Sequence, residues 1–365
     1  MMTTELTAAA IAVLQGNDRG TYTAPTSSAP AGLQRNWDSC LAALGFAGFD
    51  ETRAWTEIET LLGGQLPDGR VPDILVHDDA PGGTDQQAGP EQPALTHPPL
   101  ATSVVRQLFE RYGVRRSRPR LRMLAPKLLD WHRWFATVRD PDGTGLAAIV
   151  DPREAGMDDG PVRDGADPPF RIAEIGFNAV LQRANRDLRF LLDMVDDRAG
   201  MAEVDRMIAR TRAALEACWD RADGLYHSRD TAAGEAVGGP GIGGVLPLYA
   251  DPTLATRHPE LISGLERWLD QAMVAMPSVE PGRPEFDPRR PWRGAVSLSH
   301  NRMLHDGLRR AGRPELAARI RRDSMAVVER SGFREYFDPI TGEGLGGTGA
   351  SSTAAAVLLF AEIED

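Results

Sequence analysis

Apolar residues recur at helical spacing through most of the chain. Between residues 98 and 112 they share one helical face, behind two prolines and ahead of Gly113, so the spacing predicts a helix there. The same pattern predicts further helices over 37–46, 51–62, 121–138, 171–194, 204–218, 261–273, 294–311, 316–328 and 351–363. Alternation with a period of two, which is typical of a half-buried strand, is nearly absent.

Long loops rich in Gly, Pro and Asp separate these helices, at 78–96, 140–169, 231–244, 277–290 and 338–349. Pairs of helices with long loops at one end favour an all-α toroid, in which inner and outer helices alternate and the loops form a cup. No linker divides the chain, so we expect one catalytic domain over residues 1–365. Residues 78–99 would form a long loop insertion, which could be partly disordered.

Composition narrows the class of protein. Of the 365 residues 42% are hydrophobic and 25% are charged, which is typical of soluble folds and excludes a disordered or fibrous protein. The 41 basic and 52 acidic side chains give a net charge of -11, so nucleic acid is not an expected partner. No apolar run is long enough to cross a membrane.

Cysteine and histidine spacing exclude several kinds of site. Cys40 and Cys218 form no C-x-x-C motif and fit a reducing cytoplasm. Residues 1–15 lack a basic segment followed by an apolar core, so no secretion signal is expected. His77, His300 and His305 lack the spacing of metal ligands. We therefore expect a cytoplasmic protein without a metal or other cofactor.

Two acidic loops carry candidate chemistry. The first spans 154–161 and includes Asp158, and the second spans 332–344 and includes Glu335. Two carboxyl groups across a pocket can cleave a glycosidic bond, one as the acid for the leaving oxygen and one to activate water. Taken without context, such Gly-Asp clusters are also typical of ordinary turns.

The motifs around these loops resemble those of bacterial mannosylglycerate and glucosylglycerate hydrolases of glycoside hydrolase family 63. The resemblance runs from about residue 20 to the C-terminus, and the matching motifs keep the family's order. They lie at 36–39, 62–69, 177–179, 286–294 and 332–346. The resemblance implies an (α/α)6 barrel, which agrees with the toroid expected from the helical pattern.

The resemblance also implies roles for particular residues. Asp158 would be the general acid and Glu335 the general base of an inverting hydrolysis, with their carboxyl groups about 6.5–9.5 Å apart. Asp38 and Arg293 would hydrogen-bond sugar hydroxyls. The other residues of the matched motifs that are expected to bind substrate are Trp37, Gln65, Trp292 and Tyr336.

The predicted pocket departs from the family pattern in one direction. Arginine replaces tryptophan at Arg35, Arg153, Arg163 and Arg302, and further family rings are missing at Pro291, Ser297 and Ser352. Aromatic rings pack on sugar faces, whereas guanidinium groups suit carboxylate or phosphate. We therefore expect an anionic substrate beside several of these arginines. The alternative is that individual arginines point to solvent or pair with nearby carboxylates.

Two further features stay ambiguous at the level of sequence. His97 replaces a family Gln and could contact the ligand or act as a third acid/base group, or simply be a satisfied loop histidine. The glycine run at 237–244 has neither a preceding strand nor a following lysine, so it predicts a flexible rim loop rather than a phosphate loop.

Three functions fit these residues. The first is an inverting glycoside hydrolase acting on a small, anionic, glucosylglycerate-like α-glycoside. The second is a barrel recruited for non-hydrolytic acid/base chemistry, as a cyclase, lyase or isomerase in specialised-metabolite biosynthesis, and the missing rings favour it. The third is a binding protein, which the two retained carboxylates disfavour. The expected partner is a small molecule rather than nucleic acid or membrane, and assembly into a homo-oligomer is left open.

Overall fold

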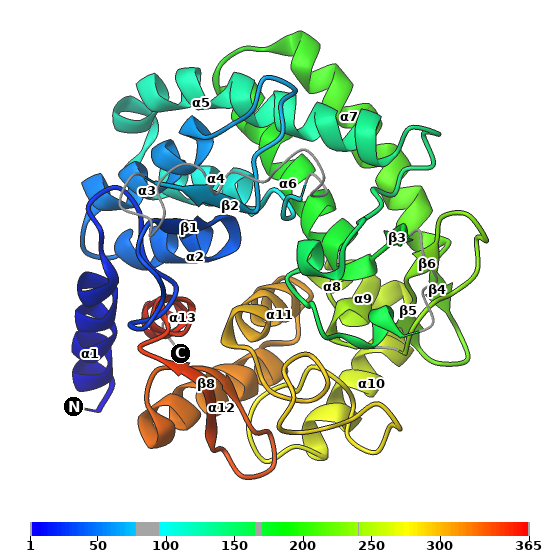
Figure 1. Ribbon diagram of the computed structural model, residues 1–365. Coiled ribbons are helices and arrows are strands. Elements are labelled where there is room, and N and C mark those ends of the chain that lie inside the picture. The colour runs from blue at the N-terminus through cyan, green and yellow to red at the C-terminus, as the bar shows by residue number, and fades with distance from the viewer. Residues whose placement is uncertain (1, 78–94, 165–169, 240, 364–365) are drawn as a thin grey trace.

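The computed structural model describes residues 2–77, 95–164, 170–239 and 241–363. Its helices form an inner and an outer ring, and the chain passes once around both (Figure 1). The inner helices are α2 (Asn36–Phe46), α4 (Leu100–Tyr112), α6 (Ile175–Met194), α8 (Pro247–Ala250), α11 (Leu298–Arg310) and α13 (Ser351–Ala361). The outer helices are α1 (Met2–Asn17), α3 (Glu51–Gly63), α5 (Val114–Trp134), α7 (Arg198–Glu216), α10 (Pro259–Asp270) and α12 (Pro314–Ser331), and the short α9 (Leu254–Arg257) joins α8 to α10.

Contacts between neighbouring inner helices close the ring. Helix α2 contacts α4, and the contacts continue through α6, α8, α11 and α13 back to α2. Helix α13 also contacts α1, so the first and last helices lie side by side (Figure 1). This surrounded position explains why α13 is apolar on nearly every side, with Ala354, Val357 and Phe360 fully buried. The arrangement is the expected (α/α)6 barrel.

The loops that enter the inner helices carry the candidate site. Asp38 lies in the first turn of α2, and His97 lies three residues before α4. Asp158, Trp292 and Glu335 lie in the segments before α6, α11 and α13. Because all inner helices run in the same direction in a barrel of this topology, these segments meet at its N-terminal end.

Short antiparallel strand pairs brace this end of the barrel. The pairs are β1 (Leu33–Arg35) with β2 (Ile74–Val76), β3 (Ile172–Ala173) with β6 (Arg229–Asp230), β4 (Trp219–Asp220) with β5 (Leu225–Tyr226), and β7 (Arg334–Phe337) with β8 (Gly344–Thr348). The expected loop over 332–344 is therefore largely a hairpin. These strands are too short to produce a visible alternation of polar and apolar residues.

Several helix boundaries differ from the sequence prediction, three of them for a clear physical reason, and α1, α8 and α9 are not among the predicted helices. Helix α5 begins at Val114 rather than residue 121. Its arginine-rich first turns lack an apolar stripe, so the spacing of apolar residues did not predict them. The helix continues into a π-helical turn, η2 (Phe135–Arg139). Helix α6 begins later than predicted, because the Glu174 side chain accepts hydrogen bonds from the first-turn amides of Gly176 and Phe177. Helix α11 also begins late, since Val296 pairs with Phe337 in an isolated bridge. The long loop expected at 78–99 falls mostly outside the described residues.

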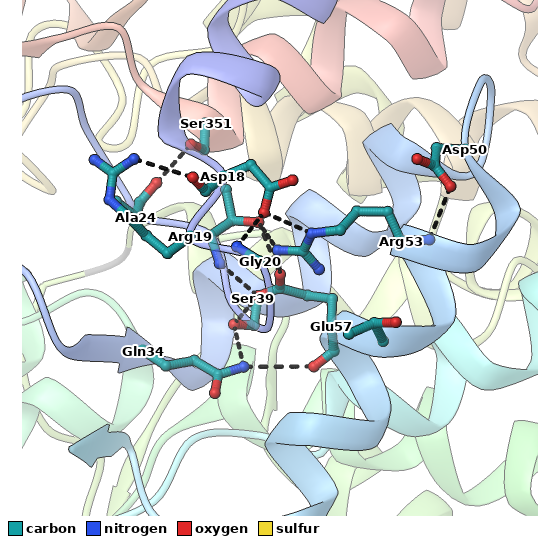
Figure 2. Close-up of polar contacts among 12 residues, drawn as sticks. Asp18, Arg19, Gly20, Ala24, Gln34, Ser39, Asp50, Arg53, Glu57 and Ser351 are labelled. Carbon is teal, nitrogen blue, oxygen red and sulfur yellow. Dashed lines mark hydrogen bonds and ion pairs between the residues drawn. The ribbon is translucent and has the colours of Figure 1, made fainter. Parts of the chain in front are cut away.

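A buried carboxylate attaches the start of α2 to α3. Glu57 is fully buried, and its Oε2 accepts from Arg53 Nη2 at 2.6 Å and from Thr23 Oγ1 at 2.7 Å. Its Oε1 accepts from Ser39 Oγ at 2.5 Å. Arg53 Nε also donates to Asp18 Oδ1 at 2.7 Å, so the cluster ties the N-terminal segment, α2 and α3 together (Figure 2). Ser39 follows Asp38 directly, so this cluster positions a candidate binding residue.

We predict that Glu57→Gln lowers the free energy of unfolding by about 3 kcal/mol, because it removes the fully buried carboxylate that pairs with Arg53 and leaves that guanidinium only the partly exposed Asp18 as a charged partner among the described residues. The measurement is urea unfolding followed by circular dichroism. Glu59→Gln on the same helix is the matched control. Glu59 is 35% exposed where it pairs with Arg120, so its loss should cost under about 1 kcal/mol. Equal losses in the two variants would contradict a special role for the buried pair.

Candidate active site

A row of aromatic rings lies across the loop end of the barrel. The Trp37 ring lies 6.4 Å from His97 and stacks on His300 at 5.6 Å, measured between ring centroids. Trp292 meets His300 edge-on at 5.0 Å and Tyr336 at 5.5 Å. The sequence predicts four of these residues as binding residues. It does not predict His300. No motif in the sequence indicates that the His300 ring belongs to this row, and its spacing from other residues only excludes a metal ligand.

Trp292 is held in an unfavourable backbone conformation. Its φ angle is 62°, in the left-handed region that large side chains seldom adopt. Such strain costs on the order of 1–3 kcal/mol and persists only where surrounding contacts enforce it, often at functional sites. Trp292 is only 7% exposed, and its edge-on contacts with His300 and Tyr336 are the surrounding contacts that hold it in this conformation.

The charges of three carboxylates act on Tyr336, at one end of the row. Burial raises the pKa of the Tyr336 phenol, and the charges of Glu335, Asp158 and Asp38 raise it further. All three acids therefore act on one ring. Glu335 Oε2 accepts a hydrogen bond from the Gly347 amide at 2.5 Å across the β7–β8 hairpin. Asp158 is exposed, and within the described chain no side chain or amide hydrogen-bonds its carboxylate.

The pKa of the Asp38 carboxyl group is raised by its surroundings. Burial raises the pKa of Asp38 to about 6, the Arg35 charge lowers it, and the Glu335 charge raises it. At neutral pH the Asp38 carboxyl is therefore ionised, and its burial makes this charged form unfavourable. A sugar hydroxyl that donates a hydrogen bond to this carboxylate would offset part of that cost.

The charged groups divide into two sides. Glu335 and Tyr336 in β7, with Asp38 in the first turn of α2, form the first side, which we call the base side. The second, which we call the acid side, contains Asp158, Asp73, Arg153 and His97. Asp73 and Asp158 both raise the pKa of His97, and both add to the raised pKa of Arg153, whose main cause is its hydrogen bond with Asp151. A ligand between the two sides would meet one candidate catalytic carboxylate from each.

Two arginines clamp the loop that carries Asp158. Arg293 Nε donates to the Asp159 carbonyl at 2.7 Å, and its Nη1 and Nη2 both pair with the Asp164 carboxylate. Arg290 Nη2 pairs with the Asp159 carboxylate at 2.7 Å. The family resemblance implies that Arg293 binds sugar hydroxyls. The structure shows its guanidinium committed to this loop, so it positions Asp158, and a sugar contact stays only a prediction.

A buried ion pair between Glu154 and Arg139 also holds the loop that carries Asp158. Glu154 is 1% exposed, and its Oε1 accepts from Arg139 Nη2 at 2.5 Å and from the Thr96 amide at 3.0 Å. Its Oε2 accepts from Arg139 Nη1 at 2.9 Å and from the Val150 amide at 2.8 Å. No sequence signal marks Arg139, because it ends a helical pattern among other basic residues and its partner lies in a separate loop.

The four arginines that replace aromatic residues do not share one location. Arg35 at the end of β1 is exposed, and within the described residues its guanidinium has no hydrogen-bond partner. Arg153 is exposed and uses its Nε and Nη2 to bind Asp151. Arg163 is exposed on the 3-10 turn η4 (Pro161–Arg163). These three lie at the loop end of the barrel.

Arg302 lies apart from the other three arginines and takes the open alternative of pairing with a nearby carboxylate. It pairs with Asp306 one turn further along α11, and its guanidinium lies over the Phe360 ring. It lines a separate cavity of about 480 Å³ with Leu44 and Arg309, toward the C-terminal ends of the inner helices. The reason is helical geometry, since successive turns of α11 move along the barrel axis away from the site.

Gln65 supports a turn. Its Nε2 donates to the carbonyls of Gly69 and Lys127, each at 2.7 Å, so its predicted contact with substrate stays a prediction. The glycine run at 237–244 lies against the Asp158 loop. Gly238 has a φ of 71°, and a Cβ there would collide with the backbone of Pro161 and Val162.

Metal clusters and membrane spans are not found in the described ranges. There, no group of three or more His, Cys, Asp or Glu side chains could hold a metal ion. No helix among the described residues is long and apolar enough to cross a membrane. Cys40 and Cys218 are both buried free thiols.

We predict that Asp38→Asn makes the protein more stable at pH 8 by about 1–3 kcal/mol. The folded-state pKa of Asp38 is near 6, above its ordinary value of 3.8, so the folded protein favours the protonated carboxyl. At pH 8 the wild-type carboxylate is ionised, which lowers the free energy of unfolding, whereas the neutral Asn side chain carries no such cost. As pH falls from 6 towards 4 the difference should shrink, and it is fully lost only below the ordinary pKa of 3.8, where the carboxyl is protonated in the unfolded chain as well. Urea unfolding at pH 8 and pH 4.5 measures it, and a variant less stable than wild type at pH 8 would contradict this origin.

Comparison with known proteins supports what the geometry suggests. The family model for the mannosylglycerate hydrolase MGH1-like glycoside hydrolase domain matches residues 32–352. The chain is 38% identical to a mannosylglycerate hydrolase of Thermus thermophilus, over 96% of this chain and 99% of the relative.

Solved structures agree in fold. The crystal structure of a GH63 mannosylglycerate hydrolase from Thermus thermophilus in complex with glucose matches with a TM-score of 0.89 at 39% identity, covering 97% of this chain and 99% of that one. The structure in complex with Tris and D-glycerate matches with a TM-score of 0.87 at 38% identity and the same coverage. The chain therefore belongs to the mannosylglycerate hydrolase MGH1-like family of glycoside hydrolases.

Proposed function

We propose that this glycoside hydrolase cleaves a small α-glycoside whose leaving group is glycerate, with inversion at the anomeric carbon. The observation that carries the proposal is the placement of Asp38, Asp158 and Glu335 in the segments that enter α2, α6 and α13, at one end of the barrel. Similarity to an enzyme named for mannosylglycerate, and to one crystallised with D-glycerate, supports this choice of leaving group.

The proposed reaction is a single displacement. Asp158 gives its proton to the glycosidic oxygen as the bond from that oxygen to the anomeric carbon breaks. Glu335 takes a proton from a water molecule that attacks the same carbon from the opposite face. The products are the free sugar and glycerate. Asp158 is left ionised and Glu335 protonated, and exchange with solvent restores both groups.

The aromatic row suits the sugar. The rings of Trp37, Trp292 and Tyr336 offer apolar faces for a pyranose, and the Asp38 carboxylate beside them can accept a hydrogen bond from a sugar hydroxyl. The Gly347 amide holds one oxygen of Glu335, which leaves its other oxygen for the attacking water.

The acid side suits an anionic leaving group. Arg153 lies within electrostatic reach of Asp158 and binds Asp151 only through Nε and Nη2, so its Nη1 can bind a carboxylate. Arg35 and Arg163 add positive charge at the same end of the barrel. Arg153 is the guanidinium that we expect to meet the glycerate carboxylate.

A barrel recruited as a cyclase, lyase or isomerase would use the same two carboxylates without activating water. The family match over most of the chain favours hydrolysis instead. A cytoplasmic location, expected from the two unpaired cysteines, stays a prediction, as does any assembly into a homo-oligomer.

We expect the wild type to release free sugar from mannosylglycerate or glucosylglycerate, and Asp158→Asn and Glu335→Gln to lower kcat by about 10²–10⁴-fold, because each removes one proton-transfer group. Glu343→Gln is the matched control, since Glu343 is exposed in the same hairpin and pairs with Arg289. The measurement is sugar release followed over hours. No release by wild type from either substrate, or full activity in either catalytic variant, would refute the proposal.

The stereochemical outcome is a separate prediction. Because Glu335 is expected to activate water rather than attack the sugar, the first product should be the β-anomer released from an α-linked substrate. Proton NMR during the first minutes, before mutarotation, distinguishes the anomers. Initial release of the α-anomer would instead indicate a covalent intermediate.

A further inference from the structure

We infer that His97 recognises a hydroxyl group of the leaving group, which donates a hydrogen bond to the His97 Nε2 atom. This inference rests on the proposed function and deepens it, because it names the residue that would tell glycerate from other 2-hydroxy acids. Three properties of the ring support it, namely its tautomer, its free nitrogen and its place in the site.

One contact sets the tautomer. His97 Nδ1 lies 3.2 Å from the backbone carbonyl oxygen of Glu154. A carbonyl oxygen can only accept, so Nδ1 carries the hydrogen. In a neutral ring Nε2 then has a lone pair and can only accept. Burial lowers the pKa of His97, and the Arg35 charge lowers it too, whereas Asp73, the Glu154 contact and Asp158 raise it, with a net fall that keeps the ring neutral at neutral pH.

The accepting atom has no partner of its own. Among the described residues nothing hydrogen-bonds Nε2, and no carboxylate lies within ion-pair distance of it. The ring is partly buried beside Trp37, at the end of the aromatic row. Nε2 is therefore an oriented acceptor at the edge of the candidate site, available to a hydroxyl donor from a ligand.

The site places this acceptor on the side of the leaving group. His97 lies against the loop that carries Asp158, because its Nδ1 contacts the carbonyl oxygen of Glu154 in that loop. Asp158 must lie next to the glycosidic oxygen to protonate it, so the atoms beyond that oxygen extend over the acid side.

Buried contacts keep the acceptor in place. The carbonyl that holds His97 belongs to Glu154, whose own carboxylate is locked by Arg139 and by the amide of Thr96, the residue before His97. Both partners of the ion pair are at most 5% exposed. The Nε2 position is thus held on two sides by the same glutamate, and binding a hydroxyl there requires little further ordering of the protein.

The ligand class follows from two groups on the acid side. Arg153 offers hydrogen-bond donors for a carboxylate, and His97 offers an acceptor for a hydroxyl. A 2-O-linked glycerate has both groups, a carboxylate and a free hydroxyl on carbon 3. Lactate has the same carboxylate and configuration but a methyl group in place of that hydroxyl, so it would leave Nε2 unpaired.

The test uses binding of intact ligands to the Asp158→Asn protein, which can hold them without turnover. Calorimetry compares α-mannosyl-D-glycerate with its D-lactate analogue. We expect the glycerate compound to bind about five- to tenfold more tightly, which is the effect of one neutral hydrogen bond. Adding His97→Leu should reduce this ratio to about one, and adding His97→Gln, whose amide oxygen can still accept, should leave an intermediate ratio.

Controls separate recognition from structure. His258→Leu removes a histidine bound to Glu216 on the outer surface and should leave the ratio unchanged. The melting temperature of each variant checks folding. The inference is overturned if the ratio survives His97→Leu in a folded protein, if both ligands weaken equally, or if the parent protein shows no preference. Sugar release by wild type tests the proposed function separately, so the two failures are distinguishable.

Discussion

Ion pairs between arginine and carboxylate side chains hold in place the segments that carry Asp38, His97 and Asp158 at the loop end of the barrel. Glu57 and Arg53 fasten the start of α2 beside Asp38, and Glu154 and Arg139 fasten the segments around His97 and Asp158. Arg293 grips the Asp158 loop from the opposite side. Arg139 and Arg293 each make two hydrogen bonds to one carboxylate, which fixes orientation as well as distance, whereas Arg53 joins two carboxylates, Glu57 and Asp18.

These pairs also decide what the site can recognise. Most guanidinium groups near Asp158 are occupied by neighbouring carboxylates, so the arginines at the loop end do not form one open anion site. Arg153 keeps one free edge, and His97 presents one accepting nitrogen. The base side is different, because burial and the Glu335 charge both add to the cost of ionising Asp38. The site that we propose therefore has an acidic side with aromatic rings for the sugar and a more polar side for the leaving group.

Much of the architecture could be predicted from the sequence. Helical spacing located most of the longer helices, because most have one face against the core, but it did not predict α1, α8 or α9. The long loops identified the end that carries the candidate site. The motifs around Asp158 and Glu335 identified the family, which the comparisons confirmed. The failures were local. Helix α5 began among arginines without an apolar stripe, and the β7–β8 hairpin was too short to show a period.

The sequence by itself determined the fold class, the family and the residue types available for acid/base chemistry, because periodicity and local motifs depend on neighbours along the chain. Only the tertiary structure decided which arginine meets which carboxylate. Arg302 and Arg153 look equivalent in sequence, yet one faces Asp306 far along α11 and the other lies near Asp158. The Arg139–Glu154 pair and the ring row from His97 to Tyr336 likewise join separate loops. Such contacts arise when the inner ring closes, so no pattern along the chain records them.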